Sequence, residues 1–506
     1  MPTTVVALKR SGGKIVQDCD VYVGRKLTMG GWNLDSPYGN PFKGKRAVYE
    51  YYKWIMEDEQ KELRDKAKKK LTNKCLGCFC KKDGKPVPCH GDILVYICDG
   101  KMPKELKQVI KAEEGVLDEV KTNQAAFTKW LGKIEPLSSE DRIAGMFTCA
   151  FMGDALGMRH EFTGKKVKFE PLMEEGFAFT SKRTHQTHVY APGQVTDDSE
   201  MTIILATHVA NKLAKNKKID ATSLVEKYMT WANSGQNFMG KNTLELLSKI
   251  KTVKGYSSHY EKKFGFTPPL NDTPTLSSDV AENQLSNGAL MRCCSLALLE
   301  DNMTIYRDIY ITNPSTAAEE MECDYLSAIR MALRGEKAKS ILKFLFRDKE
   351  DRSTEYKGVL KDLKKGKKRT LNNTQTEGKG SIMSAMYATI WCLMWYVNGV
   401  KPTSSSEEEK KTSKEDAITF LDIMKVIIIE FPGSDTDTNA TICGALLGVV
   451  IGLSACSIDE IFVSNMSKIY DYTLKTDRPR PLEYHPAGMF TILPKLCAIY
   501  SKETLE

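Results

Sequence analysis

The sequence lacks a basic stripe interleaved with aromatic residues, which is the usual pattern of a nucleic-acid interface. The formal net charge of +8 is modest for 506 residues, and much of it comes from lysine runs in segments expected to be loops. Such lysines are typical of a solvated surface, so no nucleic-acid partner is expected. No internal repeat recurs at a fixed period.

The N-terminal segment Met1 to Val6 lacks a basic region followed by a long apolar core, so no secretory signal is visible. We therefore expect an intracellular, cytoplasmic protein whose 14 cysteines are reduced thiols. Several cysteines stand in apolar contexts, where a thiol behaves as a small hydrophobic group (Cys149, Cys392, Cys443 and Cys456).

Two segments without charged residues, 382–400 and 440–458, reach about the length of a membrane helix. Polar side chains dilute the first segment, and the second directly follows carboxylates that would lie at the bilayer edge. Glycines four residues apart suit closely packed helices in either setting (Gly444, Gly448 and Gly452). We predict buried helices and no membrane partner.

The composition, 41% hydrophobic and 27% charged, is that of a globular protein. Short valine-rich strands at 4–8 and 21–24 and an amphipathic helix over 46–71 predict a small α/β domain. We predict a small cysteine-rich domain over 1–100, a helical linker formed by a helix pair over 101–138, and one large domain over 139–506. Polar surface insertions in the large domain are expected near 349–380 and 402–416.

The large domain is predicted to be helical almost throughout, so the fold class is mainly α. The apolar periodicity indicates helices over 142–156, 200–213, 224–231, 317–333, 381–396, 417–429 and 441–453.

The first acidic motif, Thr196-Asp197-Asp198, opens a predicted helix. Helix capping is sufficient to explain such residues, because threonine and aspartate accept hydrogen bonds from the free backbone N–H groups of a helix start. Taken alone, the motif favours capping.

The second acidic motif also opens a predicted helix, but it holds more oxygen-bearing side chains than one helix cap needs. Residues 434–438 carry two carboxylates, Asp435 and Asp437, and three hydroxyls, including that of Thr438. Crowded carboxylates repel unless a cation neutralises them. Neither motif contains histidine or cysteine, and no twelve-residue calcium loop is present, so oxygen ligands for Mg²⁺, Mn²⁺ or Ca²⁺ are indicated rather than a zinc site. We predict that the two motifs meet in space.

Two further segments carry polar groups in unusual settings. Asp154 follows Gly153 within an apolar run, where a carboxylate is costly to bury without a partner. Ser286-Asn287-Gly288 opens a helix that contains Arg292, a pattern that can present N–H groups to an anion.

Together the four segments resemble the ADP-ribosylglycohydrolase family, which includes the dinitrogenase reductase-activating glycohydrolases, from about residue 141 onward. The signatures are Gly-Asp-Ala-Leu-Gly with a following glutamate (Glu161), Gly-Gln-x-Thr-Asp-Asp-Ser-Glu-Met, Ser-Asn-Gly-Ala-x-Met-Arg and Gly-x-Asp-Thr-Asp-Thr-Asn, in family order. The resemblance implies a large all-α ADP-ribosylglycohydrolase-type bundle that cleaves ADP-ribose from a protein or another conjugate.

The resemblance also implies residue roles. Two Mg²⁺ or Mn²⁺ ions would be held by Thr196, Asp197, Asp198, Asp435, Asp437 and Thr438. Catalysis would depend on Glu161, Asp198 and Asp437, and the substrate would contact Gly153, Asp154, Ser286, Asn287, Gly288 and Arg292. The chain departs from the family at Ser295, usually proline, and at Asn313, usually the histidine of Thr-His-Pro.

Two other functions stay open. The substrate-side departures allow an ADP-ribose-binding module without turnover. Alternatively, residues 435–438 are the nucleophile loop of an aspartyl-phosphate hydrolase, with 424–431 as the preceding strand. Against the second interpretation, Asn439 stands where that class has threonine or valine.

The N-terminal region resembles a small uncharacterised domain family, through Tyr22 to Arg25, Gly39 to Phe42 and a Gly-Cys-aromatic-Cys segment followed by Cys-His-Gly-Asp. Its clustered zinc-type ligands are Cys75, Cys78, Cys80, Cys89 and His90. The spacing is not that of a standard zinc knuckle, so either a zinc site or a partly buried cluster of reduced thiols is expected.

Overall fold

The structure is a computed structural model. It describes the chain except for residues 12–13, 16, 28–33, 43, 45, 83–86, 162–168, 181–186, 216, 236–237, 271–283, 300–301, 367–379, 400–417, 432–433, 475, 477–478 and 504–506. The chain forms two compact units. Unit 1 comprises residues 1–122, 178–190 and 475–481, and unit 2 comprises 123–177, 191–474 and 482–506.

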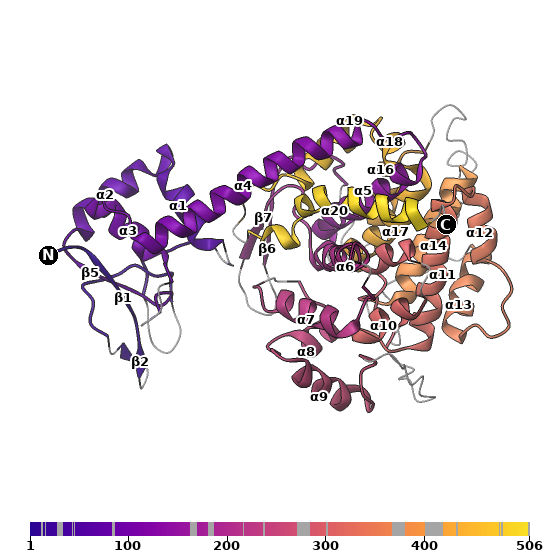
Figure 1. The fold of residues 1–506 in the computed structure, drawn as a ribbon, viewed down its shortest axis with the longest axis horizontal. Helices are drawn as coiled ribbons and strands as arrows, with labels where there is room; N and C mark the ends of the chain where they lie inside the picture. Colours follow the sequence, from indigo (N-terminus) through magenta and orange to yellow (C-terminus); the bar gives the residue numbers. More distant parts are fainter. Residues whose placement is uncertain are drawn as a thin grey trace. The chain divides into compact units, whose positions relative to one another are not determined.

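Unit 1 contains the predicted small α/β fold (Figure 1). Its central sheet has the order β1 (Thr4–Ala7), β5 (Cys75–Cys78), β4 (Val21–Tyr22), with both pairs parallel. Two short two-stranded sheets join β2 (Arg10–Ser11) to β3 (Lys14–Ile15) and β6 (Phe177–Thr180) to β7 (Thr187–Tyr190). The strands predicted near residues 4 and 21 are therefore present.

The prediction of one helix over 46–71 is wrong. The segment forms α1 (Ala47–Met56) and α2 (Lys61–Leu71), separated by a 3₁₀ turn at Asp58–Gln60. Arg64 in α2 donates hydrogen bonds to the carbonyls of Ile55 and Glu57 at the end of α1. These contacts satisfy carbonyl groups that a continuous helix would have paired internally.

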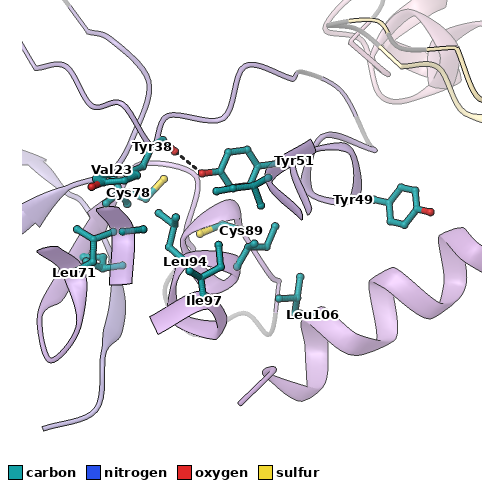
Figure 2. Packing of buried hydrophobic residues seen from close by; sticks show 14 of the residues in the cluster. Val23, Tyr38, Tyr49, Tyr51, Leu71, Cys78, Cys89, Leu94, Ile97 and Leu106 are labelled. Atoms are coloured by element: carbon teal, nitrogen blue, oxygen red, sulfur yellow. Dashed lines mark hydrogen bonds between the residues drawn. The ribbon is translucent and has the colours of Figure 1, made fainter. Parts of the chain in front are cut away.

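The core of unit 1 lies between its sheet and its helices. The apolar run 93–98 belongs to α3 (His90–Asp99), and its Ile93, Leu94 and Ile97 pack with Leu76 of the sheet and with Tyr51. Figure 2 shows Leu94, Ile97 and Tyr51 in this core, and the Tyr51 hydroxyl donates to the carbonyl of Tyr38 at 2.9 Å.

The segment predicted as a helix pair between 101 and 138 contains a single helix, α4 (Lys104–Leu131). Its buried residues include Leu106, Ile110, Val120 and Phe127. No proline interrupts this apolar spacing, and the helix continues for 28 residues.

Unit 2 is a helical bundle, and the predicted mainly-α fold class is confirmed (Figure 1). Each of the seven helices predicted for it has a counterpart. The α-helices are α5 (Ser139–Gly157), α6 (Asp197–Leu213), α7 (Ala221–Ala232), α8 (Lys241–Leu247), α9 (Val253–Phe264), α10 (Asn302–Thr312), α11 (Thr316–Leu333), α12 (Ala338–Leu345), α13 (Thr354–Lys364), α14 (Ile382–Asn398), α16 (Phe420–Glu430), α17 (Thr436–Ile451), α18 (Leu453–Cys456), α19 (Glu460–Ile469) and α20 (Met489–Glu503).

The helix α17 lies at the centre of unit 2, and it packs against α5, α11, α14 and α16. It is buried on nearly every side, because its sequence is apolar or small around the whole helix. The segment 424–431, considered above as a strand before a nucleophile loop, lies almost entirely in helix α16, and this overturns the aspartyl-phosphate interpretation.

The first part of the polar surface insertion predicted over 349–380 contains a helix with a buried apolar face. Helix α13 buries Tyr356, Val359, Leu360 and Leu363, and Tyr356 donates to the carboxylate of Asp324. Residues 367–379 and the second predicted insertion, 402–416, lie outside the described residues. Among the helices that the structure describes, none is both long and apolar enough to cross a bilayer.

Candidate metal centre

The site is built on a close crossing of α5 and α17. A Cβ atom at Gly153 of α5 would lie 2.2 Å from the carbonyl oxygen of Ala440, and one at Gly157 would lie 2.6 Å from the Cα of Asp437. Further along the same crossing, a Cβ at Gly145 would lie 2.4 Å from the carbonyl oxygen of Gly448, and one at Gly448 would lie 2.2 Å from that of Gly145. The missing side chains let the two backbones touch, and they bring the C-terminal part of α5 beside the first turn of α17.

Asp154 of α5 holds the first turn of α6. Its carboxylate accepts hydrogen bonds from the backbone N–H of Thr196 at 3.0 Å and of Ser199 at 3.1 Å, and from both hydroxyls, at 2.8 and 2.6 Å. The cap of α6 is the Thr196 hydroxyl, which accepts from the N–H of Asp198. The carboxylate of Asp198 is therefore not used as a cap.

At the start of α17, Asp435 occupies the N-cap position but its side chain forms no capping hydrogen bond. Its carboxylate instead accepts a hydrogen bond from the Asn287 side-chain amide at 2.8 Å. Asp437 accepts from the N–H of Thr438 at 3.0 Å. Capping therefore does not account for the carboxylates of the second acidic motif.

The structure brings the two acidic motifs together across more than two hundred residues, as the sequence predicts. Carboxylate oxygens of Asp154, Asp198 and Asp437 lie within 4.8 Å of one another. Oxygens of Glu161, Asp435 and Asp437 form a second group at the same spacing. Asp437 belongs to both groups, so the two candidate cation positions share a ligand.

The carboxylates raise one another's pKa. Burial, the largest cause, and repulsion from Asp435 and Asp154 raise the pKa of Glu161 to about 8. Burial raises the pKa of Asp154 to about 6, against the lowering effect of its hydrogen bonds to Ser199 and Thr196. Burial and neighbouring carboxylates likewise raise the pKa of Asp198 and Asp437 well above the usual range. Without a cation, the cluster must retain protons.

These residues fit a hard divalent cation. Asp198 Oδ1 is buried and has no hydrogen-bond partner. In the described part of the chain, no salt bridge joins any of the five carboxylates to a lysine or arginine. A dense set of oxygen donors without a basic partner is the environment that Mg²⁺ or Mn²⁺ takes, and a bound cation would satisfy the orphaned oxygen.

The remaining predicted metal ligands lie at the edge of the two groups. Asp197 is partly buried, and Glu161, Asp154 and Asp435 raise the pKa of its carboxyl, after burial. The Thr438 hydroxyl favours the charged forms of Asp198 and Asp435. Thr196 bridges Asp154 and Asp198 through its hydroxyl, at 2.8 and 3.1 Å.

The predicted substrate-side loop adjoins the second group. The N–H of Asn287 donates to the carbonyl of Gly380 at 3.0 Å, and Ser286 forms a β-bridge with Ser381. The side chain of Asn313, where the family usually has histidine, donates to the carbonyl of Ser286 at 3.0 Å. Asn313 therefore supports the loop through this hydrogen bond.

Arg292, predicted to contact substrate, is fully buried. Its guanidinium donates to the carboxylate of Asp308, to the carbonyl of Gly288 at 2.8 Å and to the Thr312 hydroxyl at 3.0 Å. The described contacts of Arg292 therefore hold the Gly288 loop, while its contact with substrate stays a prediction.

Sequence reasoning assigned no role to three residues that the geometry makes important: Ser199, Asp308 and Asn313. Ser199 directly follows the first acidic pair, and Asn313 is a motif departure, so both carried a signal. Asp308 carried none, because only the folded chain shows it as the partner of Arg292.

In unit 1, four of the five predicted zinc ligands converge: Cys78, Cys80, Cys89 and His90, with ligand atoms within 4.8 Å of one another. Cys75 is not among them. It lies three residues before Cys78 in β5, so the two side chains leave opposite faces of the sheet. Its sulfur instead approaches the carbonyl of Asp18 at 4.0 Å.

Unit 2 gathers five carboxylates near the ends of α5, α6 and α17. The protein is therefore of the class of helical proteins with an acidic centre suited to hard cations. The ADP-ribosylglycohydrolase family model matches residues 135–475, and the chain belongs to this family. At the level of the family, this membership indicates glycohydrolase activity on ADP-ribosylated substrates. Residues 6–100 match a domain of unknown function (DUF4326), in agreement with the resemblance seen in the sequence.

Two curated proteins and one solved structure are similar to this chain. The "Putative ADP-ribosyl glycohydrolase L543" of Acanthamoeba polyphaga mimivirus is 23% identical over 315 residues, which cover 60% of this chain and 84% of that protein. The "Uncharacterized protein R718" of the same virus is 36% identical over 104 residues, which cover 18% of this chain and 77% of that protein. A solved structure of an ADP-ribosylglycohydrolase-related protein complex aligns with a TM-score of 0.46 at 18% identity, covering 72% of this chain and 99% of that chain.

Proposed function

We propose that the chain is a metal-dependent hydrolase that cleaves the glycosidic bond between ADP-ribose and an acceptor, an N- or O-glycosyl bond on a protein side chain or another conjugate. The observation that carries the proposal is the pair of carboxylate groups that share Asp437. Two cations held by these groups would lie side by side, near Asn287 of the predicted substrate loop.

The cofactors would be two Mg²⁺ or Mn²⁺ ions, held by Asp198, Asp435 and Asp437 together with Thr196, Asp197 and Thr438. Bound cations of this kind hold substrate hydroxyls, lower the pKa of a water and stabilise the charge of an oxocarbenium-like transition state. Oxygen donors in both groups match the preference of these ions.

The chain's own residues would position this chemistry. Asp154 fixes the first turn of α6 through four hydrogen bonds, and Asn287 orients the carboxylate of Asp435. Glu161 stands in the second carboxylate group and is partly exposed, so solvent can reach it. We assign to Glu161 the transfer of a proton between the attacking water and solvent.

A panel of defined ADP-ribose conjugates, linked through arginine, serine, a nucleic-acid base and small molecules, tests the activity. Release of ADP-ribose is measured with Mg²⁺, with Mn²⁺ and with chelator. We expect release from at least one conjugate with metal, none with chelator, and none from Asp435→Asn or Asp437→Asn proteins that keep the wild-type circular dichroism spectrum. Undiminished turnover by either variant would refute the assignment.

A second candidate function is an ADP-ribose-binding module without turnover. Its support is Ser295, which replaces the usual proline and leaves a buried hydroxyl without a hydrogen-bond partner, and Asn313 in place of histidine. Calorimetry that detects ADP-ribose binding by a protein inactive on the whole panel would favour this function.

A further inference from the structure

Three thiols and an imidazole of unit 1 converge from two separate segments. Cys78 ends β5 and Cys80 follows two residues later, whereas Cys89 is the N-cap of α3 and His90 is its first residue. The sulfurs of Cys78 and Cys80 are 2.7 Å apart, and they lie 3.8 and 3.2 Å from Nδ1 of His90. All four ligand atoms fall within 4.8 Å of one another.

These distances suit one small metal ion. Tetrahedral zinc with Zn–S near 2.3 Å and Zn–N near 2.0 Å places neighbouring ligand atoms about 3.5 to 3.8 Å apart. The imidazole distances already lie close to this range, and the Cys78 and Cys80 sulfurs would separate by about 1 Å on binding.

The His90 ring is held in the orientation that metal binding requires. Its Nε2 lies 2.8 Å from the carbonyl oxygen of Val23. A carbonyl only accepts, so Nε2 carries the proton and Nδ1 presents its lone pair to the sulfurs. A metal-bound histidine typically donates its other N–H to such an acceptor.

The backbone around the sulfurs is also fixed. The N–H of Cys80 donates to the Cys78 sulfur at 3.3 Å. The N–H of Cys89 donates to the Asp92 carboxylate at 2.7 Å, and Lys81 pairs with the same carboxylate. Figure 2 shows Cys78 and Cys89 bordering the hydrophobic core of unit 1, where their exposure is only 2% and 1%.

A positive charge lies near the thiols. The Arg25 guanidinium interacts electrostatically with the sulfurs of Cys78 and Cys80. It would partly offset the net negative charge of one zinc ion with three thiolates.

We propose that Cys78, Cys80, Cys89 and His90 bind one structural zinc ion that joins the end of β5 to the start of α3. Four protein ligands close the coordination sphere, so the site has no position for a substrate or a catalytic water. The site is independent of the carboxylate centre of unit 2, and its test does not require glycohydrolase activity.

The experiment measures metal in the full-length protein, purified without added chelator. A mercurial reagent displaces zinc from thiolates, and a chromophoric chelator reports its release. Cobalt exchanged into the protein gives sulfur-to-cobalt charge-transfer absorption, which the carboxylate centre does not produce. The test variant is Cys80→Ser, because Cys80 is exposed and its replacement leaves the core intact. The matched control is Cys75→Ser, in the same strand but outside the group.

We expect one zinc per chain in the wild type and in Cys75→Ser, and loss of mercurial-released zinc and of the cobalt band in Cys80→Ser, with unchanged circular dichroism. Three results would overturn the proposal: a folded wild type without thiolate-bound metal, zinc retained by Cys80→Ser at wild-type affinity, or an intact mass two hydrogens lower, which indicates a Cys78–Cys80 disulfide.

Discussion

Replacing Gly153 with alanine tests the helix crossing that assembles the carboxylates. The new Cβ would lie 2.2 Å from the carbonyl oxygen of Ala440, about 1.2 Å short of the 3.4 Å at which ordinary contact begins. The carbonyl oxygen is part of the helix backbone, and the backbone also fixes the position of the Cβ, so a change of rotamer cannot relieve the contact. We expect the helices to part locally, with an overpacking cost of about 1 to 3 kcal/mol in the free energy of unfolding. Since Asp154 follows directly in α5 and Asp437 stands in α17, the two carboxylates would separate as well.

A displacement of about 1 Å between groups that act together can lower turnover on the order of 100-fold. The assays are urea unfolding, calorimetric titration of Mn²⁺ and ADP-ribose release. The control is Gly358→Ala in α13, where a Cβ meets nothing within 4 Å and should stabilise the helix by about 0.5 to 1 kcal/mol. If Gly153→Ala bound Mn²⁺ and unfolded like the wild type, the close crossing would not be what positions the carboxylates. A loss of activity alone, with both other measurements unchanged, would instead indicate that Gly153 contacts substrate.

Three further predictions concern Asn287, Arg292 and the buried His208. Asn287→Ala removes the hydrogen bond that orients Asp435, and we expect Mn²⁺ affinity to fall 10- to 100-fold by calorimetry while stability changes little; an unchanged affinity would contradict the orienting role. Arg292→Met leaves the buried carboxylate of Asp308 without its cation, and urea unfolding should show a loss of about 3 to 5 kcal/mol; a stable protein with reduced activity would instead support direct substrate contact. Burial lowers the pKa of His208 to about 4, so the unfolded chain, with a histidine pKa of about 6.5, binds more protons between these values. The free energy of unfolding should therefore fall by roughly 3 kcal/mol as the pH drops through that window, and His208→Gln should remove most of this dependence in thermal melts recorded from pH 4 to pH 7.

Much of the carboxylate centre was predictable because its residues occur in short, dense motifs at helix starts. A helix start fixes where its first side chains point, so Asp198 and Asp437 were identified without knowledge of the fold. The roles of Gly153 and Arg292 were harder to see. Their described contacts, with Ala440 and with Asp308, join segments that are distant in the sequence, and no local pattern encodes them.

The errors in secondary structure have similar causes. The break between α1 and α2 depends on Arg64 reaching back to the carbonyls of α1, which periodicity alone does not reveal. Helix α13 lies in a lysine-rich segment whose few apolar residues happen to share one face. Cys75 was grouped with the other thiols by proximity in sequence, although strand geometry directs its side chain to the other face.

Because Asp437 belongs to both carboxylate groups, the binding of two cations there would be thermodynamically linked. Protons held by the crowded carboxyls must leave as cations enter, so uptake at one position changes the charge on the ligand of the other. The apparent affinity for a divalent ion should therefore rise with pH, and the binding isotherm should depart from that of two independent equivalents. Loss of the Asp437 carboxylate would impair both positions at once, so that no variant at this residue would retain one intact site.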